Sequence, residues 1–476
     1  MEFHISLIGR KNLSVEIYRQ LRRAILDGVL GPGHLLPPSR ELARHLSVSR
    51  TTVTVAYDRL AGEGYVTSRV GAGTTVSFRR QAASGNHRKP KPPGALRPKP
   101  SWDSIRLPGA FDRVPRFAFV TGMPDASLFP HQTWRRLVAR ELRSPEVSGG
   151  AYGDAAGHPH LRKAIARHIA ISRGVETSPD DITITNGTQQ ALDIMARVML
   201  APGDTVAVED PGYQPPTRLF RSLGVRVVGV PVDAEGLVVD ALPRTARFVY
   251  VTPSHQYPLG VTMSMARRQA LLNWADRVNA AIIEDDYDSE FRFGGRPMEP
   301  LHTLDTTGRV VYVGSFSKTM LPSLRLGFVA TPPSLSIAAH KAKHVTDWHT
   351  NMLVQAALAR FIDEGDFARH VRKLGSVYRA RHELILTILD RDFGDYLEGI
   401  PSTMGLHVTA RSRHASVEDI TSISRRAFED EVAFHRLSHF AIEGPQQAGV
   451  VLGYGAVSTE DIEEGLRRLR ARFGGL

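Results

Sequence analysis

Short apolar runs alternate with helix-length segments along most of the chain. The runs are rich in Val, Ile and Thr, which favours buried strands, and they cover residues 182–185, 205–209, 225–230, 247–252, 281–284 and 309–313. The segments between them that have the length of helices are 189–200, 216–223 and 265–279. This alternation predicts an α/β domain with a mostly parallel sheet and helices on both faces, which binds ligands at the carboxyl ends of its strands.

The first 78 residues follow a different pattern. Val53, Ala56 and Leu60 have the spacing of one apolar helix face, and two further helices are predicted before them. Segments 65–69 and 74–78 then have the character of two strands joined by a glycine-rich turn. This order of elements is typical of a winged helix-turn-helix, whose third helix enters the major groove of DNA. The alternative is a small three-helix bundle with a polar surface.

The segment between these two patterned regions is rich in proline and basic residues. Residues 88–93 and 97–100 consist mostly of Pro, Lys and Arg, a composition that buries no core and stays extended. The sequence therefore predicts three parts, namely a DNA-binding domain at 1–78, a linker at 79–114 and a large domain at 115–476.

Charge supports a polyanion partner for the N-terminal part. The first 100 residues hold 17 Lys and Arg against 6 Asp and Glu, a surplus equal to the net charge of +11 of all 476 residues. We expect double-stranded operator DNA as the partner, although a solvated basic tail would give the same count. The absence of cysteine excludes disulfides and fits a cytoplasmic protein. No apolar run has the length of a membrane helix, so no membrane association is expected.

The strongest chemical signal is a lysine that follows the last apolar run. Ser315 and Ser317 precede Lys318, and Arg325 comes seven residues later. Such a lysine can condense with the aldehyde of pyridoxal 5'-phosphate, while hydroxyl and guanidinium groups hold the phosphate. Taken alone, Lys318 is more often a surface lysine, and the other residues are more often caps or ion-pair partners.

Two further strings end predicted strands. Gly187 and Thr188 open a helix, whose free N–H groups can bind a phosphate. The acidic string 284–288 can supply a carboxylate to a pyridinium nitrogen. The alternatives are a simple helix cap, a solvated acidic loop or a Mg²⁺ site. His340 and His344 have the spacing to share a metal, but they are better explained as surface residues, so no metal site is predicted.

The first 78 residues closely resemble the GntR-type winged-helix family. The matching strings are Leu36-Pro37-Pro38-Ser39-Arg40-Glu41-Leu42-Ala43, Val48-Ser49-Arg50-Thr51-Thr52-Val53 and Gly71-Ala72-Gly73-Thr74. The resemblance implies DNA contacts from Arg40, Ser49, Arg50, Thr51, Thr52 and, in the wing, Gly71.

Residues 115–476 resemble a fold-type I aminotransferase, and the whole chain resembles the MocR/GabR family, which fuses the two domains. The matching strings include Gly122-Met123-Pro124-Asp125, Tyr152-Gly153-Asp154, Thr252-Pro253-Ser254-His255-Gln256 and Asp285-Asp286-Tyr287-Asp288. The resemblance implies pyridoxal 5'-phosphate as cofactor and Lys318 as the lysine that forms its Schiff base.

The same resemblance implies the other cofactor contacts. Asp285 would pair with the ring nitrogen, Tyr287 and Gln256 would bond the ring oxygen, and Tyr213 would stack on the ring. The phosphate would be held by Gly187, Thr188, Ser315 and Arg325. Tyr152 would reach the phosphate of a partner subunit, which implies a homodimer.

One departure concerns the substrate carboxylate. Aminotransferases carry an arginine near the C-terminus for it, and Val451 stands at that place here. Family members that sense γ-aminobutyrate have another arginine where this chain has Pro215. An apolar side chain makes no bidentate carboxylate pair, so we expect neither an ordinary α-amino acid nor γ-aminobutyrate as effector. Arg116 and Arg218 are the possible substitutes.

These observations predict a pyridoxal phosphate-dependent transcriptional regulator rather than an enzyme. It would sense a small amine, or the cofactor itself, through Lys318. One alternative is a genuine aminotransferase that carries a DNA-binding domain. The other is a DNA-binding protein whose second domain has lost the cofactor.

Overall fold

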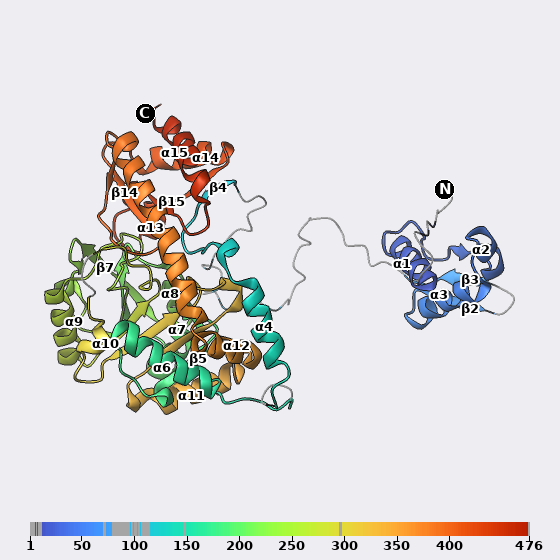
Figure 1. Ribbon diagram of the computed structural model, residues 1–476, viewed down its shortest axis with the longest axis horizontal. Coiled ribbons are helices and arrows are strands. Elements are labelled where there is room, and N and C mark those ends of the chain that lie inside the picture. The colour runs from blue at the N-terminus through green and yellow to red at the C-terminus, as the bar shows by residue number, and fades with distance from the viewer. Residues whose placement is uncertain are drawn as a thin grey trace. The chain divides into compact units, whose positions relative to one another are not determined.

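The computed structural model describes residues 12–69, 73–78, 115–145, 149–294 and 298–474, together with residues 5, 7, 96, 99, 102 and 105. The chain divides into two compact units, residues 1–97 and 98–476 (Figure 1). The boundary falls inside the segment expected as a linker, most of which lies outside the described residues.

The N-terminal unit is a winged helix-turn-helix, as the sequence predicts. Its elements are α1 (Leu13–Leu26), β1 (Leu35–Leu36), α2 (Ser39–His45), α3 (Arg50–Gly62), β2 (Val66–Arg69) and β3 (Gly73–Val76). The strands form an antiparallel sheet in the order β1-β3-β2. Val53, Ala56 and Leu60 of α3 are buried against Ile17 and Leu21 of α1, so the apolar face of α3 holds the unit together and leaves its other face exposed.

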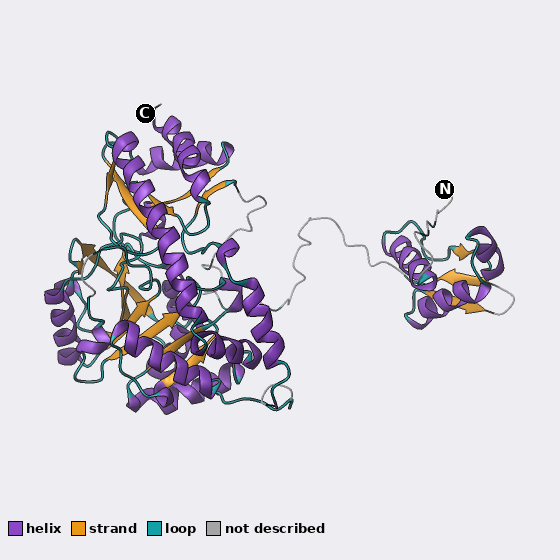
Figure 2. Cartoon of the chain, viewed as in Figure 1, coloured by secondary structure: helices purple, strands orange, loops and turns teal. Residues whose placement is uncertain are grey.

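An eight-stranded sheet forms the centre of the large unit (Figure 2). Its strands are β5 (Ile182–Thr185), β6 (Thr205–Asp210), β7 (Arg226–Asp233), β8 (Gly236–Leu237), β9 (Ala246–Val251), β10 (Ala281–Asp286), β11 (Val310–Ser315) and β12 (Gly327–Ala330). The order is β5-β12-β11-β10-β9-β6-β7-β8. Strands β11, β10, β9, β6 and β7 are parallel, whereas β12 runs antiparallel to both of its neighbours. The mostly parallel sheet is therefore confirmed.

Helices cover both faces of this sheet. They are α4 (His131–Glu141), α6 (Pro159–Arg173), α7 (Thr188–Met199), α8 (Gln214–Ser222), α9 (Met265–Val278), α10 (Leu301–Leu304), α11 (Pro333–Asp347) and α12 (Met352–Asp363). Alternate strand residues face opposite layers. Val206 and Val208 pack in one cluster with residues of α7, α8 and α11, and Ala207 packs in another with residues of α9 and α10.

A second, C-terminal lobe follows α13 (Asp366–Phe393). Its sheet contains β4 (Phe117–Phe119), β13 (Leu397–Gly399), β14 (His407–Ser412), β15 (Val432–Arg436) and β16 (Gly449–Gly453), in the order β13-β14-β16-β15-β4. Helices α14 (Val417–Glu429) and α15 (Thr459–Phe473) complete it. Strand β4 joins this sheet from far upstream by pairing in parallel with β15. Among the described residues, no helix has the length and apolar character needed to span a membrane.

Candidate functional site

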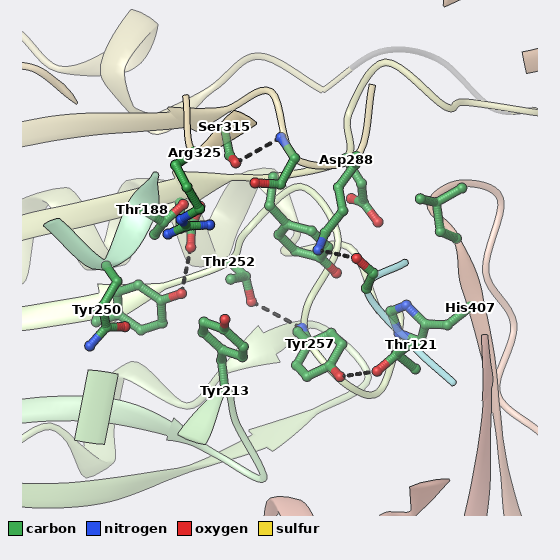
Figure 3. Close-up of a pocket in the computed structure, with 17 residues that line it drawn as sticks. Thr121, Thr188, Tyr213, Tyr250, Thr252, Tyr257, Asp288, Ser315, Arg325 and His407 are labelled. Atoms are coloured by element: carbon green, nitrogen blue, oxygen red, sulfur yellow. Dashed lines mark hydrogen bonds between the residues drawn. The ribbon is translucent and has the colours of Figure 1, made fainter. Parts of the chain in front are cut away.

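A cavity of about 300 Å³ lies at the carboxyl ends of the parallel strands (Figure 3). Its wall is formed by the ends of β9, β10 and β11, by the segments that follow β4, β5, β6, β9, β10 and β11, and by the start of β14 in the C-terminal lobe. The lining residues are Thr121, Gly122, Thr188, Gln189, Tyr213, Tyr250, Thr252, Tyr257, Asp285, Tyr287, Asp288, Ser315, Ser317, Lys318, Arg325, Leu406 and His407.

Lys318 presents its amine to this cavity. The Nζ atom donates to the carbonyl oxygen of Gly122 at 2.9 Å. Burial lowers the pKa of Lys318, and the carboxylates of Asp288 and Asp285 oppose that shift. A lowered pKa increases the share of neutral amine, which is the nucleophilic form that attacks a carbonyl group.

Asp285 lies at the end of β10 with one oxygen satisfied and one without a partner. Its Oδ2 accepts a hydrogen bond from the Tyr250 hydroxyl at 2.6 Å, whereas Oδ1 is buried and has no partner among the described residues. Burial raises the pKa of Asp285 to about 7. A protonated ring nitrogen would satisfy this oxygen and favour the charged carboxylate, so the residue fits a pyridine cofactor.

The start of α7 forms a phosphate-sized cradle. Gly187 has φ +78°, and a Cβ there would lie 2.8 Å from the Arg325 guanidinium, so only glycine leaves this space open. Arg325 donates through Nη2 to the carbonyl oxygen of Asn186 at 2.8 Å. Thr188 is the first residue of α7, and Ser315 at the end of β11 also lines the cavity. Helix N–H groups, hydroxyls and one guanidinium together suit a phosphate.

Four tyrosines line the cavity, and the rings of three of them contact one another. The Tyr213 and Tyr257 rings meet edge to face at 5.6 Å, and the Tyr257 and Tyr287 rings do so at 6.0 Å. The Tyr257 hydroxyl is 2.5 Å from the Thr121 hydroxyl, as drawn in Figure 3. Burial raises the pKa of Tyr287 well above its usual value, so its hydroxyl stays protonated and is able to donate.

Most of the residues predicted to contact a cofactor lie together in this cavity. Those in its wall are Lys318, Asp285, Tyr287, Tyr213, Thr188, Ser315 and Arg325, and Gly187 adjoins Arg325.

Gln256 and Tyr152 lie elsewhere. The Gln256 amide nitrogen donates to the carbonyl oxygens of Pro211 and Tyr257, each at 2.9 Å, and its oxygen accepts from the backbone of Leu259. Its amide is thus engaged by the backbone, and the next residue, Tyr257, lines the cavity. Tyr152 is 78% exposed and packs its ring on Trp348 at 4.4 Å, outside the wall.

The acidic string separates because neighbouring strand residues face opposite sides of the sheet. Asp285 faces the cavity, whereas Asp286 pairs with Arg173 at 2.7 Å on the other side. Glu284 accepts hydrogen bonds from the backbone of Leu301 and His302. These carboxylates therefore have separate partners and do not converge as one Mg²⁺ site would require.

Sequence reasoning missed several residues of the site. Thr121 and His407 carry no local signal, because they reach the cavity from distant parts of the chain. Asp288 and His255 belong to two of the strings that resemble an aminotransferase, but the sequence assigns neither residue a role. Glu209 is buried behind the wall, where burial raises its pKa to about 7 and Thr252 donates to it at 2.6 Å.

Val451 lies in an apolar cluster instead of offering a cation. It is fully buried in β16 with Leu259, Leu437 and Phe440. Arg116 pairs with Asp461 at 2.8 Å, and Arg218 is exposed on α8. Neither arginine is among the residues that line the cavity, so Arg325 is the one guanidinium that the described part of the chain places in its wall.

The N-terminal unit presents a second candidate site at the start of α3. Ser49 caps the helix by accepting from the backbone of Thr52 at 3.1 Å. Arg50 and Thr51 are exposed beside it, and Arg40 is exposed on α2. Gly71, the predicted wing contact, lies outside the described residues. An uncovered helix start with hydroxyl and guanidinium groups is the surface that a major-groove helix presents to DNA.

Two family models match the chain, one over each unit. The gntR family of bacterial regulatory proteins matches residues 13–76, and the aminotransferase class I and II family matches residues 126–469. The chain is 38% identical to the probable rhizopine catabolism regulatory protein MocR of Rhizobium meliloti, over 96% of this chain and 93% of that protein. It is 34% identical to the HTH-type transcriptional regulator TauR of Rhodobacter capsulatus, with 82% of each covered.

A solved structure supports the cofactor. The α-aminoadipate aminotransferase LysN of Thermus thermophilus, complexed with N-(5'-phosphopyridoxyl)-L-leucine, matches with a TM-score of 0.68 and 32% identity over 75% of this chain and 92% of that one.

A gntR-type winged helix joined to an aminotransferase-like domain defines a class of transcriptional regulator. This chain belongs to the MocR type of that class, as a DNA-binding regulator that depends on pyridoxal 5'-phosphate.

Proposed function

We propose that the aminotransferase-like domain is a sensor, and that a small primary amine, or the cofactor itself, is the signal that changes DNA occupancy. The observation that carries this proposal is Lys318. Its amine, with a lowered pKa, lies in the same cavity as the phosphate cradle and Asp285, one oxygen of which has no partner among the described residues. The same chain carries the exposed start of α3.

Different residues of the cavity would bind different parts of the cofactor. When bound, pyridoxal phosphate supplies an electrophilic carbon and an electron-withdrawing ring. Arg325, Gly187, Thr188 and Ser315 would hold its phosphate, and Asp285 would pair with its ring nitrogen. Tyr213 would cover the ring face, and Tyr287 would donate to the ring oxygen.

Lys318 is the group that an effector amine would displace. Once released, its amine can accept a proton, because Asp288 and Asp285 stabilise the charged form. Such a displacement changes DNA binding only if the effector binds the two conformations of the protein with different affinity. We therefore expect the released Lys318 and the occupied cavity to favour one arrangement of the regulator on DNA.

We expect an effector without an α-carboxylate. Arg325, the guanidinium in the cavity wall, is held at the phosphate cradle by its hydrogen bond to the carbonyl oxygen of Asn186. Apolar Val451 occupies the place of the carboxylate arginine. Apart from Lys318 and Arg325, which the amine exchange and the phosphate would engage, a carboxylate brought into this cavity would meet Asp285, Asp288 and phenol groups.

We also propose a homodimer with shared sites. Tyr152 is highly exposed for an aromatic residue and is held against Trp348, with His349 beside it. This position suits a residue that reaches the phosphate site of a partner subunit. A DNA partner further supports the expected location in the cytoplasm.

The second candidate function is a genuine aminotransferase, which the complete cofactor cradle favours. Primary amines with and without carboxylates should be screened for a change in the absorption of the bound cofactor, and each responding amine then incubated with a keto acid. We expect responses from amines without an α-carboxylate and no catalytic turnover. Repeated turnover of an amino donor and a keto acceptor would establish the enzyme and contradict the sensor.

A further inference from the structure

His255 lies directly behind the Tyr287 hydroxyl. It follows β9, is 1% exposed, and places Nδ1 2.9 Å from Asp288 Oδ2 and 3.1 Å from the Tyr287 hydroxyl. The Tyr287 hydroxyl donates its single proton to the carbonyl oxygen of His255 at 3.0 Å, and it would turn this proton to the cofactor ring oxygen when the ring is bound. An ionised carboxylate only accepts hydrogen bonds, so Asp288 fixes the proton on Nδ1 and leaves Nε2 as an acceptor.

The other side of His255 is held by the C-terminal lobe. The Ser402 hydroxyl lies 3.2 Å from Nε2 and 3.1 Å from the carbonyl oxygen of Met404, so its one proton is shared between the imidazole and segment 402–407. The His407 ring packs on the imidazole at 4.7 Å. Gly405 has φ +89°, and a Cβ there would lie 2.0 Å from the imidazole Cε1 and 2.6 Å from Asp288. The segment 402–407 thus closes over the imidazole without space for a side chain at its centre.

The groups that face His255 come from several elements. Asp288 and Tyr287 follow β10, His407 begins β14, and His382 lies on α13. Burial lowers the pKa of His407 well below its usual value and also lowers that of His382. Both therefore stay neutral near pH 7, and Asp288 is the charged group in direct contact with the imidazole.

We propose that His255 is a positioning residue that sets the Tyr287 hydroxyl against the cofactor ring oxygen and links it to segment 402–407 of the C-terminal lobe. Asp288 holds one imidazole nitrogen and Ser402 the other, so a shift of segment 402–407 alters the support of Tyr287. By reciprocity, a change at the ring oxygen alters the preferred position of the lobe. The inference rests on cofactor binding and deepens the proposed sensor function.

A metal ion is the rival explanation for this cluster. Ligand atoms of His255, Asp288 and His407 lie within 4.8 Å of one another. However, His255 and Asp288 already bond each other, and His407 Nε2 lies 2.9 Å from the carbonyl oxygen of Pro258. Elemental analysis of the purified protein separates the two explanations, because the positioning role predicts no stoichiometric metal.

The test is a pH titration of the visible absorption band of the bound cofactor. A hydroxyl that donates to the ring oxygen stabilises its ionised form, so loss of this donor raises the midpoint. We expect His255→Leu to raise it by about 0.5–1 pH unit, the equivalent of one hydrogen bond. His255→Asn keeps an N–H near the position of Nδ1 and should restore most of the shift. His168→Leu, on α6 against Phe367, is the control for loss of a partly buried imidazole.

Ser402→Ala is the decisive variant, because Ser402 does not line the cavity and its loss leaves the histidine in place. It should shift the midpoint in the same direction by a smaller amount, and should add nothing in a His255→Leu background. An unchanged midpoint in Ser402→Ala, fully additive shifts, or one metal ion per chain would overturn the assignment. If the wild type binds the cofactor and shows a measurable pH midpoint while no amine changes its absorption spectrum, the sensor proposal fails. In that case the titration still decides the role of His255.

Discussion

Asp285 and Asp286 are adjacent in sequence and yet serve opposite faces of one sheet. The first faces the cofactor cavity, and the second forms a buried ion pair with Arg173. Which carboxylate reaches the cavity thus follows from strand alternation. In the loop after β9, Gln256 and Tyr257 also differ in environment, because the backbone engages the amide and the neighbouring phenol enters the cavity.

Lys318→Ala should abolish the visible absorption band of the bound cofactor, because that band requires a covalent bond between the lysine and the cofactor. Lys341→Ala, on the exposed side of α11, is the matched control and should keep the band. Spectra of both variants, purified with excess pyridoxal phosphate, check this. A band that survives Lys318→Ala unchanged would refute the lysine assignment.

Asp285→Asn should change how the stability of the cofactor-free protein depends on pH. Burial raises the pKa of Asp285 from 3.8 to about 7, so the folded protein retains a proton that the unfolded chain releases between these values. The stability that Asp285 contributes is therefore present below pH 3.8 and is lost as the pH rises through 7.

Asparagine is neutral throughout this range and removes the dependence. Urea unfolding at about pH 5 and about pH 8 should show that the wild type loses more stability over this interval than Asp285→Asn. Burial also raises the pKa values of Glu209 and Glu290 to about 7. Glu290 contributes equally to both proteins, and Glu209 loses only its repulsion from Asp285 in the variant. Parallel pH profiles would contradict the raised pKa.

Val451→Arg should destabilise the protein instead of creating a carboxylate site. The side chain is fully buried among apolar residues of β16 and its neighbours, so an unpaired guanidinium there should cost about 3 kcal/mol or more. Val451→Ala removes two methyl groups and should cost about 1–2 kcal/mol. Denaturant unfolding compares the two, and equal losses would show that the arginine finds a charged partner or water.

At the scale of elements, the sequence predicts the central sheet better than the C-terminal lobe. Strand β5 matches its predicted bounds and the other five predicted strands shift by a few residues, because buried parallel strands are continuous apolar runs. Strand β12 was not predicted, since it lies antiparallel between β11, which precedes it in sequence, and the distant β5. Nor was the lobe that draws β4 next to β15 across some 300 residues of chain. Thr121 and His407 reach the cavity through these long-range pairings, which no local pattern records.

We expect Arg50, at the start of α3, to contribute to DNA binding. Arg50→Ala should weaken binding to DNA from upstream of the protein's own gene by about 1–3 kcal/mol, because an exposed guanidinium beside the helix cap is lost. Arg23→Ala, on α1 and paired at the surface with Asp27, should leave affinity nearly unchanged. Gel shifts at fixed salt measure both, and equal affinities of the two variants would contradict α3 as the recognition helix.

At the scale of the whole molecule, one chain combines a basic winged helix with a cofactor domain that lacks a carboxylate arginine in the described part of its cavity wall. The net charge lies in the first 100 residues, and we propose that the covalent chemistry takes place at Lys318. A regulator needs a ligand that distinguishes two conformations, and a displaceable lysine provides such a difference without turnover.

The most direct test of this account is the affinity of the cofactor-loaded protein for its operator DNA, measured by fluorescence anisotropy during titration with amines that alter the cofactor spectrum. The account predicts that at least one such amine changes the dissociation constant of the wild type severalfold and leaves that of Lys318→Ala unchanged. Amines that alter the spectrum while DNA affinity stays constant, or an equal response in Lys318→Ala, would contradict it.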